Sequence, residues 1–322
     1  HEMMSRCDTL LMVGSNFPYS EFLPKEGQAR GVQVDIDGRN LGVRYPMEVH
    51  LQGDSAATLR ALLPMLERKP EGAWRRDIVV NVKEWCETLA KRAQVAADPL
   101  NPQLVFHELS PRLPDDALVT TDTGSAVFWF ARHIRVRQGQ MGAHSGMLAS
   151  MGAAMPYAIA AKFAHPGRPV VAIVGDGAMQ MNGMNAMITV AKYWRRWRDP
   201  RFVVVVLNNR DLEFVSWEQR ITGGSAKFPG SQDLPDVNYA QYAEMLGFRG
   251  LRVSAPGEVA AAWQEAFASE RPVLLEAMVD PSVPMTPPHL TVEQVRNFLE
   301  ALRSGDPDAA RIVRASVKDM LA

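Results

Sequence analysis

The chain has very little cysteine and almost no net charge. Its 322 residues include only Cys7 and Cys86 as cysteines, too few for a disulfide scaffold or a cysteine metal site. The 35 Lys and Arg residues are balanced by 36 Asp and Glu residues, so the chain lacks the basic field that binding to a nucleic-acid backbone requires. These shortages argue against a disulfide-stabilised secreted protein and against a nucleic-acid-binding protein.

Long apolar runs and spaced glycines are missing as well. No run reaches the length of a membrane span, and the first residues do not have the pattern of a signal peptide. We therefore expect a cytoplasmic protein. The loop from Gly14 to Pro18 lacks the G-x-G-x-x-G spacing of dinucleotide-binding folds, so a nicotinamide-dependent dehydrogenase is the least favoured class of enzyme. The length leaves room for two domains.

The most informative stretch runs from residue 170 to residue 214. Val170–Val174 and Phe202–Leu207 are continuous β-branched and apolar runs, typical of parallel strands buried on both faces. Apolar residues at helical spacing predict a helix over residues 178–193 between them. A strand, a helix and a strand form a crossover unit, and ligands of such sheets bind at the carboxyl ends of the strands.

Polar residues come directly after both of these strands. The first strand is followed by Gly175, Asp176 and Gly177, and the predicted helix begins at Ala178. The second strand is followed by two asparagines, the second of which is Asn209. Glycine lets the backbone approach a phosphate closely, and a helix N-terminus favours an anion. Carboxylate and amide oxygens suit Mg²⁺, which keeps phosphate oxygens in its shell. The alternative for each motif taken alone is an ordinary turn or loop cap.

A similar loop comes after a third predicted strand, 117–121. Asp122, Thr123, Gly124 and Ser125 form another strand end rich in hydroxyls and glycine, a reasonable contact for a diphosphate. The equally open alternative is a strand-to-helix cap with Asp122 or Thr123 as the acceptor.

The first part of the chain predicts a smaller α/β layer. Strands are expected at 9–13 and 31–36, the second ending near Asp35 and Asp37, and a helix from about Ser55, its proposed N-cap, to Glu67.

Together these segments resemble thiamine diphosphate-dependent enzymes, most closely pyruvate oxidases and quinone-linked pyruvate dehydrogenases. The resemblance implies an α/β protein with doubly wound parallel sheets, in which a thiamine diphosphate-binding fold comes after a partial Rossmann-like middle domain. The segments that carry it are CDTLLMVGSNFPYSEF (7–22), VQVDIDGRNLG (32–42), TTDTGSAVFWFAR (120–132), ASMGAAMPYAIAAK (149–162), the GDG and NN motifs, and PPHLTVEQ (287–294).

The resemblance also implies the domain plan. We expect a partial middle domain at 1–72, a connector with a helix near 80–97 at 73–102, the diphosphate-binding domain at 103–285 and a C-terminal extension at 286–322. A helix is expected over 308–321, where docking on the protein is favoured over contact with a membrane surface. No segment resembles the N-terminal pyrimidine-binding domain of the family, so we expect a chain that is inactive alone.

Several site residues are implied by the family's pattern. Asp176, Asn209 and the backbone carbonyl of Asp211 match the Mg²⁺ ligands, and Asp122 and Ser125 match the diphosphate loop. The cofactor's thiazolium ring is implied to lie against the segment Ala149, Ser150 and Met151, with Met151 as the wedge under the ring and the Ala149 carbonyl as an acceptor. Judged from composition alone, Met151 is ordinary helix packing.

Phe214 and Glu218 match positions on the substrate side of the cofactor. Glu218 would handle protons on the bound intermediate, and the alternative is a solvated charge on a helix face. The chain departs from the family in two places. Close relatives often carry glycine where this chain has Glu213, and the spacing between the GDG and NN motifs is longer, the surplus lying in the basic aromatic turn 194–201.

The resemblance further implies FAD. The strand end at Asp35 and Asp37 matches the region near the adenosine, although related thiamine enzymes keep this domain without a flavin. The loop matched to the flavin contact consists of Gly14, Ser15, Asn16, Phe17 and Pro18.

The implied activity is oxidative decarboxylation of a 2-oxo acid, most simply pyruvate, with thiamine diphosphate, Mg²⁺ and FAD, and with quinone or oxygen as the electron acceptor. A homo-oligomer, dimer or tetramer, is the expected assembly. A non-oxidative lyase or synthase of the acetolactate synthase or decarboxylase type would share every thiamine residue named. A non-catalytic binding fragment is the third alternative.

Overall fold

The computed structural model describes residues 1–287 and 289–322. The chain forms two compact units, residues 1–85 and 86–322. Residue 288, within the PPHLTVEQ segment of the predicted extension, lies outside the described residues. The expected domain boundaries at 72, 102 and 285 stay a prediction.

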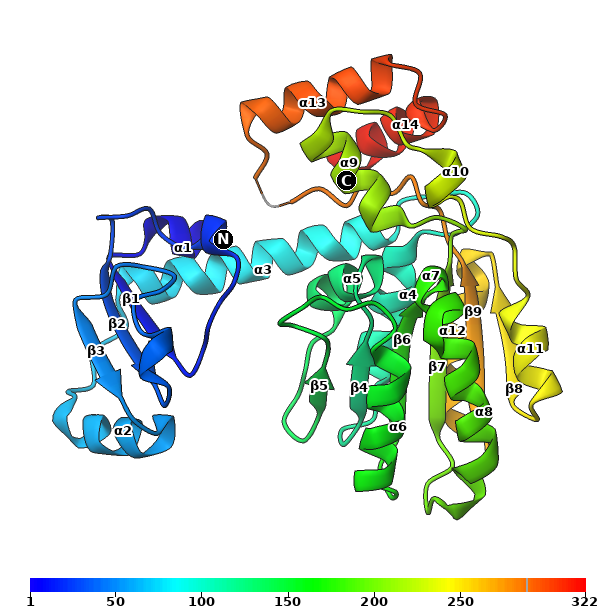
Figure 1. Cartoon of the computed structure of the whole chain (residues 1–322), viewed down its shortest axis with the longest axis horizontal. Helices are drawn as coiled ribbons and strands as arrows, with labels where there is room; N and C mark the ends of the chain where they lie inside the picture. Colours follow the sequence, from blue (N-terminus) through cyan, green and yellow to red (C-terminus); the bar gives the residue numbers. More distant parts are fainter. Residues whose placement is uncertain (288) are drawn as a thin grey trace. The chain divides into compact units, whose positions relative to one another are not determined.

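The first unit is built on a parallel three-stranded sheet of order β1-β2-β3 (Figure 1). The strands predicted at 9–13 and 31–36 are confirmed within one residue. The helix after them starts as predicted, but Asp54, not Ser55, is the N-cap, since its carboxylate accepts a hydrogen bond from the Ala57 N–H. The elements are α1 (Glu2–Arg6), β1 (Thr9–Val13), β2 (Arg30–Asp35), β3 (Val49–Gln52) and α2 (Ser55–Leu62).

The connector helix is longer at its start than predicted. Helix α3 (Ala73–Ala93) begins before residue 80 and ends before residue 97. The division between the two units falls within it.

The second unit contains a six-stranded sheet of order β5-β4-β6-β7-β9-β8, in which every pair is parallel. The fold class predicted from the sequence, α/β with parallel sheets, is confirmed. The two buried runs form the adjacent central strands β6 and β7. The strands are β4 (Leu118–Thr121), β5 (Met141–Ala143), β6 (Val170–Gly175), β7 (Phe202–Asn208), β8 (Arg249–Val253) and β9 (Val273–Met278).

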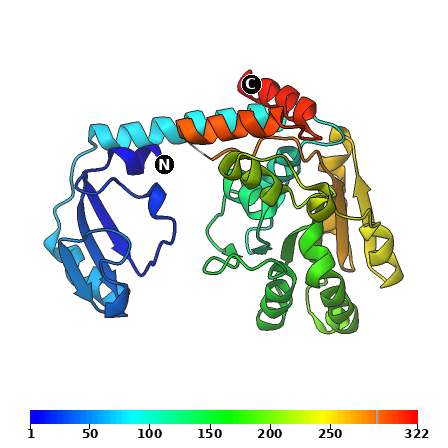
Figure 2. The same ribbon diagram turned by 45° about the horizontal axis from the view of Figure 1, so that its top comes forward.

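Helices cover both faces of this sheet, because alternate strand residues point to opposite sides. Val171 and Val203 pack in one core with α4, α5 and α12, and Val170 and Phe202 pack in the other with α6, α8 and α11. Helices α6 and α8 lie side by side on the second face (Figures 1 and 2). Their bounds are α4 (Pro102–Leu109), α5 (Ser125–His133), α12 (Pro256–Ala268), α6 (Ala154–Ala164), α8 (Met184–Tyr193) and α11 (Tyr239–Met245).

The crossover between β6 and β7 starts earlier than predicted. A short helix, α7 (Asp176–Ala178), opens it, and a π-helical turn, Met179–Gly183, leads into α8. π-Helical turns are frequent at functional sites. The basic aromatic turn 194–201 directly precedes β7, so it lies at the amino end of that strand, as predicted.

Four further helices lie beyond the carboxyl ends of the strands (Figure 1). The tail helix predicted over 308–321 is observed as α14, and its Ile312 is fully buried in the core that contains Trp217. These helices are α9 (Glu213–Gly223), α10 (Pro229–Gln232), α13 (Val292–Arg303) and α14 (Ala309–Met320).

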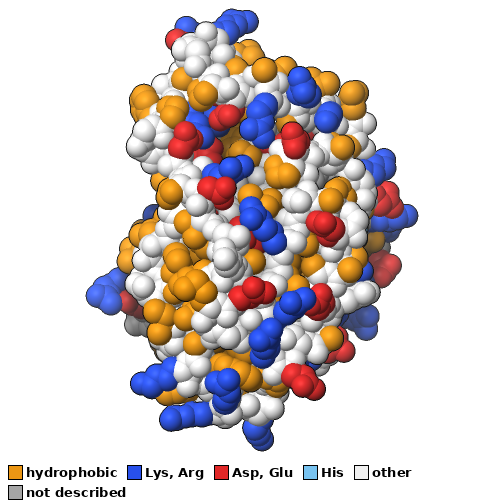
Figure 3. Space-filling model, turned by 90° about the vertical axis from the view of Figure 1, so that its right-hand side faces the viewer, with side chains coloured by type: hydrophobic (Ala, Val, Ile, Leu, Met, Phe, Trp, Pro, Cys, Tyr) orange, Lys and Arg blue, Asp and Glu red, His pale blue; other side chains and the backbone are white. Residues whose placement is uncertain are grey.

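The surface of the second unit carries both signs of charge. On the side where β8 and α11 lie in Figure 1, Lys and Arg side chains alternate with Asp and Glu side chains (Figure 3). No helix among the described residues is long and apolar enough to cross a membrane.

Candidate functional site

The loops at the carboxyl ends of β6 and β7 are joined through one carboxylate. Asp176 Oδ2 accepts hydrogen bonds from the backbone N–H groups of Asn209, at 3.0 Å, and Arg210, at 2.6 Å. Its Oδ1 accepts from the Gly177 N–H at 2.8 Å. The structure therefore brings the GDG and NN motifs into direct contact at the carboxyl edge of the sheet.

The buried Asp176 carboxyl has no basic partner among the described residues. Burial raises the pKa of its carboxyl to about 7, although three backbone N–H groups act in the opposite direction. No ion pair of the described residues involves it. A buried carboxylate without a basic partner is a natural ligand for a cation.

Asn209 and Asp211 supply further oxygens next to it. Asn209 Oδ1 accepts from the Asp211 N–H at 2.9 Å. The side chain of Asp211 is occupied, since it accepts from the Ser216 hydroxyl and pairs with Lys227, both at 2.6 Å. No hydrogen bond of the described residues ends on the Asp211 carbonyl, which leaves that oxygen for the cation predicted from the sequence.

The candidate site combines three kinds of oxygen-bearing group. Nowhere in residues 1–287 and 289–322 do three or more His, Cys, Asp or Glu side chains gather as a metal cluster. A carboxylate, an amide and a carbonyl fit a hard cation such as Mg²⁺ better than a soft one. A cavity of about 340 Å³ is lined in part by Asn209, Arg210, Asp211 and Lys227.

Backbone strain marks two loops of the site. Ala149, with a φ of 48°, and Arg210, with a φ of 58°, are the non-glycine residues with positive φ in the described part of the chain. Such conformations persist where the surrounding structure imposes them, and they cluster at ligand sites. Both residues belong to segments matched to the cofactor.

Asp122 has a structural role in this loop system. Its fully buried carboxylate accepts from the N–H groups of Thr123, Gly152 and Ala154 at 2.8–3.0 Å. Burial raises its pKa, and these three hydrogen bonds oppose the rise. Asp122 therefore does not cap α5, whose N-cap Gly124 has no side-chain hydrogen bond, and the predicted contact with a diphosphate stays a prediction. Asp122 fixes the 149–152 segment relative to β4.

Met151 lies against the GDG motif. A Cβ at Gly177 would lie 2.8 Å from Leu212 Cδ2 and 3.7 Å from Met151 Cε. The side chains of Leu212 and Met151 therefore pack closely against the Gly177 backbone. At Gly175 a Cβ would meet nothing within 4 Å. The exposed Ser150 donates its N–H to the Ser145 hydroxyl.

Phe214 and Glu218 lie one turn apart on α9, and both are exposed, Phe214 by 41%. The Phe214 Cβ lies 3.8 Å from where a Cβ of Gly124 would be. The helix therefore presents Phe214 beside the β4 loop. Their predicted catalytic roles stay predictions.

Two residues of the site, Lys227 and Tyr239, were not predicted from the sequence. Lys227 is buried between Asp211 and Asp233, with 2.6 Å to each carboxylate. Burial alone would lower the pKa of Lys227, but these carboxylates raise it. Tyr239, fully buried, donates to the Asp176 carbonyl and accepts from Gln180, and burial raises its pKa to about 12. Neither residue lies in a motif.

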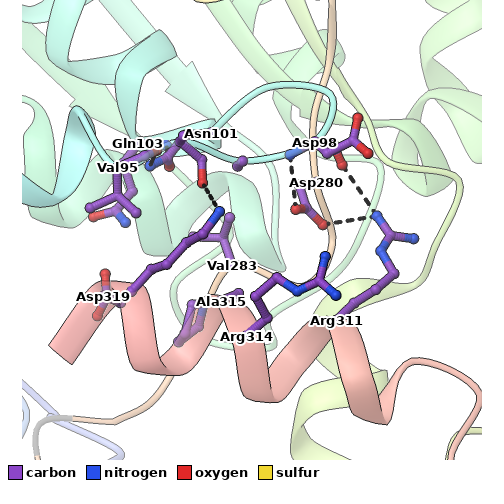
Figure 4. A pocket seen from close by; sticks show the side chains of 14 residues that line it. Val95, Asp98, Asn101, Gln103, Asp280, Val283, Arg311, Arg314, Ala315 and Asp319 are labelled. Atoms are coloured by element: carbon purple, nitrogen blue, oxygen red, sulfur yellow. Dashed lines mark hydrogen bonds and ion pairs between the residues drawn. The ribbon is translucent and has the colours of Figure 1, made fainter. Parts of the chain in front are cut away.

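The C-terminal segment is anchored to α9 by buried charges. Arg220 pairs with Asp306 at 2.8 Å and with Asp308 at 3.1 Å. On α14, Arg311 reaches Asp280 and the carbonyl of Asp98 beside a cavity of about 240 Å³ (Figure 4). Asp280 comes just after β9, so the tail is tied to the same edge of the sheet.

In the first unit, the residues matched to FAD lie at the carboxyl ends of β1 and β2. Gly14 has a φ of 59° and donates to the Val34 carbonyl. Asp35 already accepts from the N–H of Asp37 and from Asn40.

Asp37 pairs with Arg39, whose hydrogen bond lowers the pKa of this carboxyl to about 2. Within the loop, Asn16 accepts from Arg44, and Phe17 packs on the core of the unit. Both carboxylates matched to the adenosine region are therefore already paired.

Comparison with known proteins agrees with this geometry. Residues 122–277 match the model of the thiamine pyrophosphate enzyme C-terminal TPP binding domain, and residues 1–62 match that of the thiamine pyrophosphate enzyme central domain. YdaP of Bacillus subtilis (strain 168), whose name describes it as thiamine pyrophosphate-containing, is 35% identical over 298 residues, covering 92% of this chain and 50% of YdaP.

Two other relatives differ in their named activity. A pyruvate oxidase of Lactiplantibacillus plantarum is 27% identical, over 88% of this chain and 46% of its own length. The acetolactate synthase isozyme 1 large subunit of Escherichia coli (strain K12) is 26% identical, over 89% of this chain and 50% of its own. The chain spans about half the length of these relatives. The chain belongs to the thiamine pyrophosphate enzyme family.

Proposed function

We propose that the chain is the central and diphosphate-binding part of an enzyme that decarboxylates a 2-oxo acid, pyruvate first, with thiamine diphosphate and Mg²⁺. We further propose that FAD takes the electrons and passes them to a quinone or to oxygen. The activity is completed by a pyrimidine-binding domain, and the assembly is a homo-oligomer.

One observation carries the proposal: the contact of Asp176 with the backbone of Asn209 and Arg210. It gathers a buried carboxylate, an amide and an unused carbonyl at the edge where ligands of parallel sheets bind. The residues present therefore fit a cation that holds a diphosphate.

Each group of the site has a separate task. Asp176, Asn209 and the Asp211 carbonyl would hold Mg²⁺. Gly175, where a Cβ would meet nothing within 4 Å, leaves the backbone open to a phosphate, and Met151, against Gly177, would support the cofactor's ring. When bound, thiamine diphosphate supplies the carbanion that takes up the substrate carbonyl and the electron sink that allows carbon dioxide to leave.

The exposed face of α9 would receive the substrate. Phe214 offers an apolar wall, and Glu218, one turn further on, is placed to exchange protons with a ligand over that face. An apolar wall on the substrate side suits a small 2-oxo acid with a short apolar chain.

A second candidate, acetolactate synthase or a related lyase, is supported by the comparable identity of those relatives. It would use the same residues up to the loss of carbon dioxide. The difference lies in the next acceptor, a second keto acid instead of FAD. Asp35 and Asp37 are already paired with neighbouring residues, so no free carboxylate supports the FAD assignment. The experiment therefore monitors the flavin itself.

The test supplies the chain with an N-terminal pyrimidine-binding domain of the family, thiamine diphosphate, Mg²⁺ and FAD. Pyruvate is then added without oxygen while the visible band of the flavin is monitored. Bleaching that is lost in Asp176→Ala supports the oxidative function. Carbon dioxide release without bleaching would assign the chain to the lyases or synthases. Bound cofactors with neither signal would overturn both activities.

A further inference from the structure

Glu213 places a second carboxylate next to the candidate cation ligands. It is the first residue of α9, and its side chain is 3% exposed. Its Oε2 accepts from Asn209 Nδ2 at 2.6 Å. The carboxylate therefore lies in contact with one of the three oxygen-bearing groups of the site.

The other oxygen of Glu213, Oε1, is buried and accepts no hydrogen bond that the described residues make in full geometry. No ion pair of the described residues includes Glu213, and the buried Lys227 pairs instead with Asp211 and Asp233. A buried carboxylate oxygen left in this state is costly unless a cation or a proton comes to it.

The surroundings of Glu213 are apolar and negatively charged. Burial raises the pKa of its carboxyl, a hydrogen bond from the hydroxyl of Ser125, at the start of α5, opposes the rise, and the charges of Asp211, Asp176 and Asp280 add to it. Ser125 belongs to the loop expected to meet the diphosphate. Glu213 thus lies between Asn209, a proposed cation ligand, and that loop.

We propose that Glu213 is an additional ligand of the divalent cation, so that this site takes the cation before thiamine diphosphate and without it. The inference rests on the proposed cation site and goes beyond it. The chain itself would offer the cation two carboxylates, an amide and a carbonyl. Ligand charge is what raises the affinity of such sites for a hard cation.

The test measures Mn²⁺ binding to the chelator-treated full chain by isothermal titration, with no thiamine diphosphate present. Mn²⁺ prefers the same oxygen ligands as Mg²⁺. We expect one Mn²⁺ per chain, and a dissociation constant about tenfold higher, or more, in Glu213→Gln, which keeps the shape but loses the charge. Glu270→Gln, at an exposed position, is the matched control and should equal the wild type.

Thermal unfolding separates a ligand from a structural carboxylate. Removal of an unpaired buried charge should raise the Tm of the metal-free Glu213→Gln chain, and Mn²⁺ should raise the Tm of the wild type more than that of Glu213→Gln. A lower Tm without metal in Glu213→Gln, with unchanged Mn²⁺ binding, would show a structural role and overturn the proposal. Glu213→Asp, which keeps the charge, serves if Glu213→Gln does not fold, and should retain Mn²⁺ binding.

Binding measurements with thiamine diphosphate distinguish a failure of the Glu213 proposal from a failure of the proposed function. If Mn²⁺ binds only after thiamine diphosphate is added, the inference about Glu213 fails while the proposed function stands. If thiamine diphosphate with Mg²⁺ does not bind to the wild type or to Glu213→Gln, the proposed function fails as well.

Discussion

The ammonium group of Lys227 lies 2.6 Å from the carboxylate of Asp211. It pairs at the same distance with Asp233, which lies opposite Asp211 in an antiparallel bridge. Lys227 therefore closes the loop that carries the Asp211 carbonyl, the proposed cation ligand. The side chain of Asp211 serves the fold, which leaves its backbone carbonyl for the proposed ligand role.

Lys227→Met should destabilise the chain strongly, because it leaves the buried carboxylate of Asp211 without its partner. Breaking a buried pair in this way costs about 3 kcal/mol. Urea unfolding measures the loss, and Lys91→Met, at an exposed position of α3, is the control and should change stability by less than about 0.5 kcal/mol. Equal stability of the two variants would contradict the role of Lys227.

His133 predicts a dependence of stability on pH. It is buried on α5 beside Trp129 and Gln103, and burial, with a smaller effect of His107 and Arg132, lowers its pKa from 6.5 to about 3. The unfolded chain takes up the proton first as the pH falls. The free energy of unfolding is therefore unaffected by His133 above about pH 6.5. It decreases through His133 as the pH falls from 6.5 toward 3.

The variant His133→Gln removes this proton site. Between pH 7.5 and pH 5 the wild type should lose about 2 kcal/mol of unfolding free energy through His133, and His133→Gln should lose that much less. Urea midpoints at both pH values measure the difference. His165→Gln, at an exposed position, should retain the wild-type dependence, and the same dependence in all three chains would rule out His133 as the source.

Gly177 is expected to tolerate no side chain. A Cβ there would lie 2.8 Å from Leu212 Cδ2 and 3.4 Å from Leu234 Cδ1, so Gly177→Ala should cost about 1–3 kcal/mol and weaken Mn²⁺ binding. Gly257→Ala meets nothing within 4 Å and should be neutral or stabilising by up to about 1 kcal/mol. Thermal unfolding of both variants tests the contrast. If Gly177→Ala is as stable as Gly257→Ala, the backbone is not closely packed at the motif.

The central part of the fold is predictable because its signals are local. β-Branched runs specify β6 and β7 independently of the rest of the chain, and parallel strands bring the loops at their carboxyl ends to one edge of the sheet. The meeting of Asp176 with Asn209 is a consequence of that arrangement alone. Strands β3, β5, β8 and β9 were not predicted. For β5 and β8, Met141–Ala143 and Arg249–Val253 contain too few apolar residues for a pattern.

The parts that escaped prediction depend on contacts between distant segments. Lys227 lies in a polar stretch without a motif, and only the fold brings it to Asp211. Asp122 has the residue type of a ligand, and only the positions of Gly152 and Ala154 show that its oxygens are used. The departure at Glu213 was visible in the sequence, but its unpartnered oxygen was not.

The most direct test of the thiamine site is the binding of thiamine diphosphate with Mg²⁺ to the full chain, measured by isothermal titration for the wild type, Asp176→Asn and the exposed control Asp8→Asn. We expect binding to the wild type and to Asp8→Asn, and at least about tenfold weaker binding to Asp176→Asn, because the cation loses its buried carboxylate. Circular dichroism confirms that the variants are folded. Equal binding by Asp176→Asn and the wild type, or no binding by the wild type, would contradict the assignment of this site.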